Sequence, residues 1–470
     1  MFKISILKYE RFFFIFSVAL ILLNNSCVSE KKDDSIMIKN IFDETLVNSE
    51  CYDNLRILCK NIGPRLSGSP EAAKAVEWGE HLLKKYGLDK VYLQDVMVPH
   101  WIRGEKEKAA FIDDNETVFV PNVCALGGSV GTDGQIEAGI IEVHNFEELA
   151  KSGKTKIEGK FVFYNRPMNP TYIDTFKSYE TCVDQRSKGA VEAAKYGAVG
   201  VLVRSMNLKI DRFPHTGTMK YEDGVKKIPA AAVSTEDAEY LSKLIEINKN
   251  LKVSLTMDCK TLPDENTFNV IGEITGAKYP DKIIAIGGHI DSWDITEGAH
   301  DDGAGVVQSV EVIRTFKALG YKPNHTLRVV MFMNEENGTM GGKTYAKIVD
   351  EKKEIHVAAI ESDSGAFSPR GFTIDGPSEK ISKIQKWKSY LEPYNLHKIE
   401  KGFGGVDIGP LRKVDANLLL IGLLTDSQRY FDYHHAASDT FESVNKRELE
   451  LGAASMASLV YLIDKYGIAD

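Results

Sequence analysis

Residues 282–294 read Lys-Ile-Ile-Ala-Ile-Gly-Gly-His-Ile-Asp-Ser-Trp-Asp, an apolar run that ends abruptly in polar side chains. The run from Lys282 to Gly288 is short and almost continuously apolar, which is typical of a buried strand in a parallel sheet. Open α/β sheets bind ligands just beyond the carboxyl ends of their strands, so His289 and Asp291 stand where a functional site is expected. The stretch therefore predicts a parallel sheet, and it predicts that the functional site lies at the edge formed by the carboxyl ends of the strands.

Strands and helices alternate downstream of this stretch. Apolar residues recur at helical spacing from Val306 to Leu319. Three further apolar runs predict buried strands at 327–333, 356–360 and 417–424. This alternation predicts an α/β fold with a mostly parallel central sheet and helices on both of its faces.

Polar residues that can bind a metal ion follow each predicted strand. The five segments concerned are His289 to Asp294, Ala299 to Gly305, Asn334 to Gly338, Glu361 to Gly365 and Tyr433 to Thr440. Taken singly, each has an ordinary explanation, since a lone His or Asp at a strand end is usually a cap and Asp-Asp-Gly usually begins a helix. All five together, at one edge of one sheet, favour a shared site.

A two-metal hydrolase needs this combination of side chains. Two zinc ions about 3.5–4 Å apart, sharing a carboxylate, can hold a water and polarise a carbonyl group. Such a centre takes neutral nitrogen and anionic oxygen ligands. It also needs a carboxylate outside the ligand set to accept the proton of the water. A carboxylate beside a ligating imidazole orients that ring, which gives Asp291 a role next to His289.

The motifs, in this order, resemble the co-catalytic zinc peptidases of the aminopeptidase and glutamate carboxypeptidase superfamily. The resemblance covers about residues 50–465 and is carried by Gly287 to Asp294, Asp301 to Gly305, Glu335-Glu336, Glu361 to Asp363, and His434-His435 with Asp439-Thr440. It implies two zinc ions per subunit as cofactors and peptides as substrates.

The resemblance also implies the site residues. They are two pairs of zinc ligands, His289 with Asp363 and Glu336 with His435, a bridging carboxylate, Asp301, a general base, Glu335, and a catalytic partner of His289, Asp291. The ligand His of the family stands four residues before the Asp of Asp-Thr, which favours His435 over His434. The roles of His434 and Asp407, which lies in a loop similar to a family loop near the metals, stay open.

The amino-acid composition of the upstream half differs from that of the downstream half. From about Pro121 to Met257 the chain is rich in Gly and in short β-type runs, without clustered catalytic residue types. This stretch is similar to a β-rich protease-associated insert. The chain is therefore divided into a tether and first helix at 28–49, a first peptidase part at 50–118, the insert at 119–257 and a second peptidase part at 258–470. Upstream of the insert, the sequence predicts helices at 36–60 and 70–87.

The first 26 residues predict a secretory signal. Basic residues precede an apolar run from Phe12 to Leu23, which is shorter than the ~20 residues of a membrane-spanning helix. Cys27 follows Ser26 as in a bacterial lipobox, which predicts a lipidated mature N-terminus. Plain secretory cleavage is the alternative. Either way we expect an exported protein, lipid-anchored at the bacterial cell envelope or secreted.

The charge and the cysteine pattern of the chain limit the kinds of binding partner and cross-link that are expected. The 470 residues include 58 Lys and Arg against 67 Asp and Glu, a net charge of −9, so nucleic acid is not an expected partner. Contact with a membrane is expected only through the lipid anchor, and the sequence allows a homodimer. The cysteines form no CxxC pair, and Cys51 and Cys59 could be a disulfide or two free thiols.

The sequence therefore predicts a zinc-dependent exopeptidase that hydrolyses dipeptides or short peptides by a metal-activated water, with a Glu as general base. An aminopeptidase acting on longer peptides is the main alternative. A glutaminyl cyclase and a catalytically dead binding module are two others. The complete set of ligands argues against the cyclase, and the presence of every ligand and of the base argues against a dead module.

Overall fold

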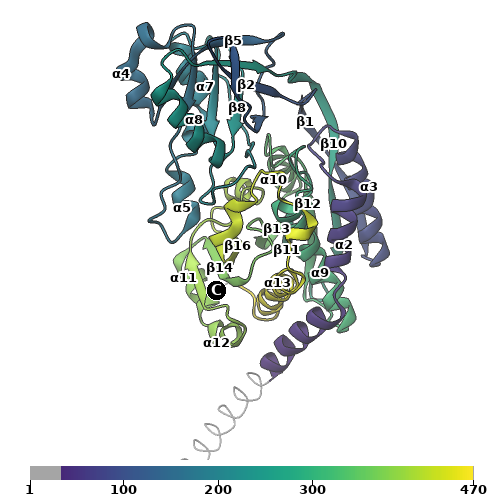
Figure 1. Ribbon diagram of the computed structural model, residues 1–470. Coiled ribbons are helices and arrows are strands. Elements are labelled where there is room, and N and C mark those ends of the chain that lie inside the picture. Colours follow the sequence, from purple (N-terminus) through teal and green to yellow (C-terminus); the bar gives the residue numbers. More distant parts are fainter. Residues whose placement is uncertain (1–32, 469–470) are drawn as a thin grey trace, which may run out of the picture.

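The computed structural model describes residues 33–468, so the predicted signal segment 1–26 and Cys27 lie outside the described residues. Within the described part, the chain forms two sheets of eight strands each. Helices pack around both sheets, and the second sheet lies at the top of the view in Figure 1. No described helix has the length and apolar character needed to cross a membrane.

The first sheet has the strand order β1-β10-β12-β11-β13-β16-β14-β15. Its strands are β1 (Lys90–Ile102), β10 (Lys260–Ile274), β11 (Tyr279–His289), β12 (His325–Phe332), β13 (Ile355–Glu361), β14 (Pro369–Asp375), β15 (Lys398–Lys401) and β16 (Leu419–Thr425). The four buried strands predicted from the sequence are β11, β12, β13 and β16, and they are parallel to one another.

The expectation of a mostly parallel sheet is corrected, because the sheet is mixed. Strand β10 pairs antiparallel with β1 and β12, and β14 pairs antiparallel with β16. Parallel neighbours need a crossover connection, usually a helix. Residues 362–368, between β13 and β14, are too few for one, so β14 runs back in the opposite direction.

Helices cover both faces of the first sheet, as the sequence predicts. Strand β11 shows why, since its side chains alternate between two cores. Ile284 and Ile286 pack with α3 (Pro70–Lys85), α9 (Ala304–Ala318) and α13 (Lys446–Tyr466) on one face. Ile283 and Ala285 pack with α10 (Met340–Lys352) on the other. The remaining helices of this part are α11 (Ser378–Gln385), α12 (Lys388–Leu391), and the short turns η3 (Glu392–Tyr394), η4 (Gly409–Lys413), η5 (Ser427–Asp432) and η6 (Phe441–Ser443).

The upstream helices differ from the single helix expected at 36–60. A helix at 33–48 ends before Ser49, and α2 (Cys51–Ile57) then runs into a π-helical turn, η1 (Leu58–Ile62). Helix α3 follows the expected signals. Its N-cap Ser69 accepts the N–H of Ala72, and Gly87 lies just past its end with a φ of 65°.

Asp34 fastens the helix at 33–48 to the last helix of the chain. Its buried carboxylate accepts hydrogen bonds from Tyr461 at 2.7 Å, from Lys465, and from Tyr466. Burial alone would raise the pKa of Asp34, but these three donors outweigh it and hold the pKa below its usual value. The two ends of the described chain are therefore joined by one ionised side chain.

The five cysteines of the described residues are buried free thiols, so Cys51 and Cys59 form no disulfide. Burial raises the pKa of Cys51 well above its usual value and that of Cys59 to about 12. Thiols in such surroundings are unreactive at neutral pH.

The second sheet has the order β3-β2-β9-β5-β6-β7-β8-β4. Its strands are β2 (Lys108–Asp113), β3 (Glu116–Phe119), β4 (Val123–Ala125), β5 (Ile136–Val143), β6 (Phe161–Tyr164), β7 (Gly200–Arg204), β8 (Ala230–Val233) and β9 (Lys252–Thr256). It carries helices α4 (Phe146–Ile157), α5 (Thr175–Glu180), α6 (Asp184–Ser187), α7 (Gly189–Lys195) and α8 (Thr235–Ile247). This sheet begins at Lys108, upstream of the boundary at 119, and we refer to residues 108–257 as the insert.

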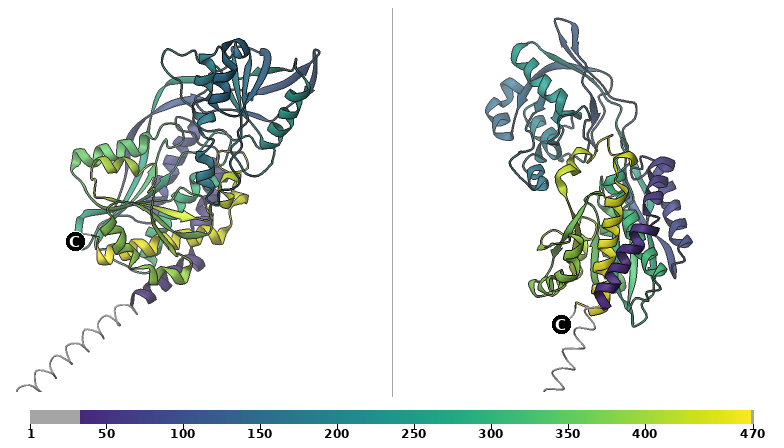
Figure 2. Two further views of the ribbon diagram at one scale, coloured as in Figure 1. Left: turned by 90° about the vertical axis from the view of Figure 1, so that its left-hand side faces the viewer. Right: turned by 60° about the horizontal axis from the view of Figure 1, so that its bottom comes forward.

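Two long strands connect the sheets. β1 and β10 are paired antiparallel from Lys90 with Glu273 at one end to Ile102 with Lys260 at the other. They leave the first sheet together and enter the insert side by side (Figure 2). The insert is thus attached through a hydrogen-bonded ribbon.

Candidate metal centre

The five residues predicted as metal ligands lie together at the carboxyl ends of the parallel strands. His289 ends β11, Asp301 lies in the π-helical turn η2 (Ala299–Gly303) before α9, Glu336 follows β12, Asp363 follows β13, and His435 follows η5. All are buried except Asp363, which is half-buried. Segments far apart in the sequence therefore meet at the expected edge of the sheet.

The carboxylate of Asp301 lies between two histidines. Its Oδ1 is 3.1 Å from Nε2 of His289, and its Oδ2 is 3.5 Å from Nε2 of His435. A second carboxylate accompanies each ring. Oδ1 of Asp363 is 3.6 Å from His289 Nε2, and Oε2 of Glu336 is 3.2 Å from His435 Nε2. The arrangement is two His–carboxylate pairs with one carboxylate between them.

These oxygens have no other partner. Within residues 33–468, Asp301 Oδ2, Asp363 Oδ1 and both carboxylate oxygens of Glu336 are buried without a hydrogen bond. Buried anionic oxygens are costly unless a cation compensates them. Burial by itself would lower the pKa of His289, yet Asp301 and Asp363 raise it well above its usual value. The cluster thus favours positive charge at its centre, and its oxygen and nitrogen donors fit a divalent metal such as zinc.

Asp291 contacts both His289 and the turn that carries Glu335 and Glu336. Its backbone carbonyl lies 3.0 Å from Nδ1 of His289, which leaves Nε2 facing the carboxylates. Its side chain accepts the backbone N–H groups of Glu335, at 3.1 Å, and Glu336, at 3.4 Å. The backbone carbonyl of Asp291 thus orients the ring, in place of the carboxylate expected from the sequence, and the carboxylate fixes the turn that carries the glutamates.

Two further aspartates, quoted in the motifs without a role, fix the backbone of the site. Asp302 accepts the N–H of His289 at 3.1 Å and the N–H of Gly305, in the first turn of α9, at 2.9 Å. Asp439 accepts the N–H groups of His300, at 2.8 Å, and Asp301, at 3.1 Å. The sequence signal for both was present, but their function as backbone acceptors required the fold.

Glu335 and Glu336 leave the strand in different environments. Asn334 has a φ of 71°, and this left-handed turn places Glu336 in the cluster while Glu335 is half-buried beside it. Burial, and then the neighbouring carboxylates, raise the pKa of Glu335 to about 8. Cations bound among those carboxylates would lower this pKa and favour the ionised form.

Asp407 and His434 occupy the rim of the same cluster. Asp407 is buried, and within the described residues neither of its carboxylate oxygens has a hydrogen-bond partner. Burial and the charges of Glu361 and Glu335 raise the pKa of Asp407 well above its usual value. His434 stacks on His435 with 3.5 Å between ring centroids. Of these two rings, only that of His435 pairs with an acidic oxygen of the described residues, although a nitrogen of each ring lies within 4.8 Å of an Asp301 oxygen.

The insert also reaches the cluster, through residues that the sequence did not single out. Tyr179 packs 5.4 Å from the ring of His434, and Arg186 Nη1 lies 3.4 Å from His435 Nδ1. Thr216 and Thr218 contact the backbones of His435 and Glu336. These are isolated polar residues in helices and loops, so no spacing in the sequence marks them.

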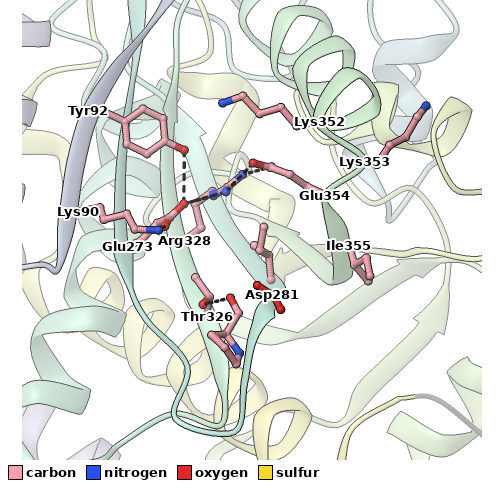
Figure 3. Close-up of a pocket in the computed structure, with 12 residues that line it drawn as sticks. Lys90, Tyr92, Glu273, Asp281, Thr326, Arg328, Lys352, Lys353, Glu354 and Ile355 are labelled. Atoms are coloured by element: carbon pink, nitrogen blue, oxygen red, sulfur yellow. Dashed lines mark hydrogen bonds and ion pairs between the residues drawn. The ribbon is translucent and has the colours of Figure 1, made fainter.

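A pocket of about 510 Å³ lies elsewhere, at the amino ends of β11, β12 and β13. Figure 3 shows that the side chains of Glu273, Arg328 and Glu354 are directed at one another. Arg328 pairs with Glu273 at 2.7 Å and with Glu354 at 2.6 Å. Two carboxylates thus neutralise Arg328, and none of the predicted site residues lines this pocket.

Known proteins share this sequence and architecture. Residues 269–460 match the model of peptidase family M28. Carboxypeptidase Q from Bos taurus is 36% identical over 413 residues, which are 88% of this chain and 84% of that protein, and the Homo sapiens protein matches with the same figures. The crystal structure of a peptidase M28 precursor from Shewanella amazonensis SB2B has a TM-score of 0.87 at 32% identity, covering 93% of this chain and 99% of that one.

A more distant structure shares the fold. BSAP, a zinc aminopeptidase from Bacillus subtilis, has a TM-score of 0.64 at 19% identity, covering 88% of this chain and 94% of that one. With this fold, this cluster and these relatives, the chain is a metallo-exopeptidase. It belongs to peptidase family M28, together with the carboxypeptidase Q proteins.

Proposed function

We propose that this chain is a two-zinc exopeptidase that removes one residue from dipeptides or short peptides. The observation that carries the proposal is the position of Asp301, whose two oxygens face two different histidines, at 3.1 and 3.5 Å. A carboxylate with one oxygen for each of two sites is the bridge that a two-metal centre requires.

The geometry supports one ligand set for each ion. His289 and Asp363 lie on the Oδ1 side of Asp301, and Glu336 and His435 lie on its Oδ2 side. Zinc ions bound there would polarise the scissile carbonyl and make the attacking water more acidic. The chain's own contribution is to hold these donors in place from four different strand ends, in a site shielded from bulk water.

Glu335 is the general base of this proposal. It lies next to the ligand Glu336 but is half-buried, and its backbone is fixed by Asp291. In this position its carboxylate accepts the proton of the attacking water and delivers it to the amine that leaves. Asp291 acts through His289 and Glu335 as a positioning residue.

Arg186 favours substrates with a free C-terminal carboxylate. Its side chain is buried and contacts the Thr216 carbonyl, His435 and the Tyr179 ring, none of which is an acid. Within residues 33–468, its Nε has no hydrogen-bond partner. A buried guanidinium without a counter-charge is costly, so an anionic group that enters beside it is stabilised. This favours a carboxypeptidase or dipeptidase over an aminopeptidase that acts on long peptides.

The proposal is tested with unblocked, N-blocked and C-blocked dipeptides, combined with metal analysis of the purified protein. We expect two zinc ions per chain, cleavage of the unblocked dipeptide, and slow cleavage of the C-blocked one. Removal of zinc by a chelator should abolish cleavage, and added zinc should restore it. Equal cleavage of C-blocked dipeptides and longer peptides would favour the aminopeptidase, and a zinc-loaded protein that cleaves none of them would contradict a peptidase. Cyclisation of an N-terminal glutamine by a protein with one zinc ion would favour the cyclase.

A further inference from the structure

One loop of the insert, residues 215–218, lies against the half of the centre formed by His435 and Glu336. His215 forms an isolated antiparallel bridge with Ala436. The backbone N–H of Thr216 donates to the carbonyl of His435 at 3.0 Å. The backbone at His435 and at the next residue is therefore paired with the insert.

The same loop faces the outer nitrogen of His435. Nε2 of the ring faces Glu336 and Asp301, so Nδ1 is the nitrogen directed at the insert. Arg186 Nη1 lies 3.4 Å from that nitrogen and 3.5 Å from the Thr216 carbonyl. A ligating imidazole is commonly oriented by a contact at its other ring nitrogen.

The space beside this ring is closely filled. A methyl group added at Gly217 would lie 2.6 Å from His435 Nδ1 and 2.4 Å from Arg186 Nη1. The φ of Gly217 is 129°, which an L side chain rarely adopts. Only glycine lets the loop approach the histidine this closely.

Thr218 reaches the other member of the pair. Its hydroxyl donates to the backbone carbonyl of Glu336. The loop is itself anchored in the insert, since Thr216 Oγ1 donates to the Ala125 carbonyl at 2.8 Å and Gly127 N–H donates to the Gly217 carbonyl at 2.9 Å. The loop thus transmits the position of the insert to both residues.

The other half of the centre is held differently. His289 is fixed by Asp302 through its backbone and by the Asp291 carbonyl through Nδ1, and both of these lie outside the insert. His289 is therefore held from outside the insert. Glu336 is held both by Asp291, at its backbone N–H, and by Thr218 of the insert, at its backbone carbonyl.

We propose that the loop 215–218 is a positioning element for one metal position, that of Glu336 and His435, and that the insert sets the affinity of this position separately from that of His289 and Asp363. The inference rests on the proposed two-ion centre. It gives the insert a part in holding metal although it supplies no ligand.

Thr218→Val tests the inference, because valine keeps the shape of threonine and removes the hydroxyl. Metal-free protein is titrated with Zn²⁺ against a chelating indicator and with Co²⁺ by its visible spectrum. We expect one of the two ions to bind about 10-fold more weakly, the lower end of the usual effect of losing such a contact, while the other binds as in the unsubstituted protein. Thr218→Ser, which restores a hydroxyl, should recover the affinity.

Thr132→Val is the matched control, since Thr132 also donates from its hydroxyl to a carbonyl in the insert, that of Met257 at 3.2 Å. It should leave both affinities unchanged. Gly217→Ala should weaken the same ion as Thr218→Val, with Tm recorded to show that each variant is folded. Two unchanged affinities in Thr218→Val, or an equal loss at both positions, would overturn the inference. An unsubstituted protein that binds fewer than two ions contradicts the two-ion centre itself, and the inference falls with it.

Discussion

The side-chain carboxylate of Asp291 accepts the backbone N–H of Glu335 at 3.1 Å, while the Asp291 backbone carbonyl lies 3.0 Å from Nδ1 of His289. One buried residue thus fixes the proposed base and a proposed ligand relative to each other. Errors of about 1 Å in such a site are enough to lower rates by about 10²-fold. Because Glu335 lies outside the proposed ligand set, the base can still be tested separately from the metal.

Glu335→Gln should leave both zinc ions bound and lower kcat by at least ~10²–10⁴, because glutamine keeps the size of the side chain but cannot accept the proton. Glu336→Gln is the matched control, one residue along the same turn, and should lose zinc instead. Both kcat and bound zinc are measured on each variant. Loss of metal in Glu335→Gln and retention in Glu336→Gln would reverse the two roles.

Arg186→Met should raise KM for a dipeptide with a free C-terminus by about 10- to 100-fold, since hydrogen bonds to a charged group contribute about 1.5–3 kcal/mol. Cleavage of the amidated dipeptide should be nearly unchanged. Arg204→Met is the control, because Arg204 is another buried arginine of the insert but already pairs with Glu239 at 2.7 Å. Discrimination between free and amidated substrates that survives in Arg186→Met would rule out a role for Arg186 in carboxylate binding.

Asp34→Asn should lower the free energy of unfolding at pH 7 by about 1–2 kcal/mol through the loss of charge-assisted hydrogen bonds. The folded-state pKa of Asp34 is below its usual value, so the ionised side chain stabilises the fold above the ordinary aspartate pKa. This stabilisation is lost as the pH falls through the folded-state pKa. Urea unfolding of both proteins at several pH values should therefore show the difference shrinking as the pH falls below the ordinary aspartate pKa of about 3.9. Asp43→Asn, which removes an exposed ion pair with Lys39 on the same helix, should change stability by less than about 0.5 kcal/mol at any pH.

Cys27 should carry a diacylglyceryl group at the mature N-terminus, because it directly follows the apolar run and Ser26. Mass spectrometry of the protein isolated from its own membrane fraction checks this. Cys27→Ser should release the protein from that fraction. A mature chain that begins at another residue, without lipid, would favour plain secretory cleavage.

The sequence was most informative where burial is complete. The strands β11, β12, β13 and β16 are apolar over most of their length, and each was predicted. Strand β10 was missed, and its first half is a mostly exposed ribbon without apolar periodicity. The mixed character of the sheet was missed because strand direction depends on connections such as residues 362–368, whose sequence marks a loop but not the direction taken after it.

The residues of the candidate site also fall into two groups, those that could be predicted from the sequence and those that could not. Residues at strand ends, such as His289 and Glu336, could be predicted because a sheet brings its carboxyl ends together. Arg186 and Thr218 could not, since only the docking of the insert brings them to His435 and Glu336. Nothing in their local sequence encodes that contact.

The ribbon of β1 and β10 has a consequence for how this architecture can change in evolution. Because Ile102 and Lys260 are register partners, the chain leaves for the insert and returns from it at neighbouring points. An inserted segment whose two ends are adjacent can be lengthened, shortened or exchanged without altering the path of the chain through the first sheet. An exchanged insert would fold onto the same ribbon, yet it would also have to bring its own loop to His435 and Glu336. Swapping inserts between relatives is therefore simple in topology but demanding where the insert packs against the metal centre.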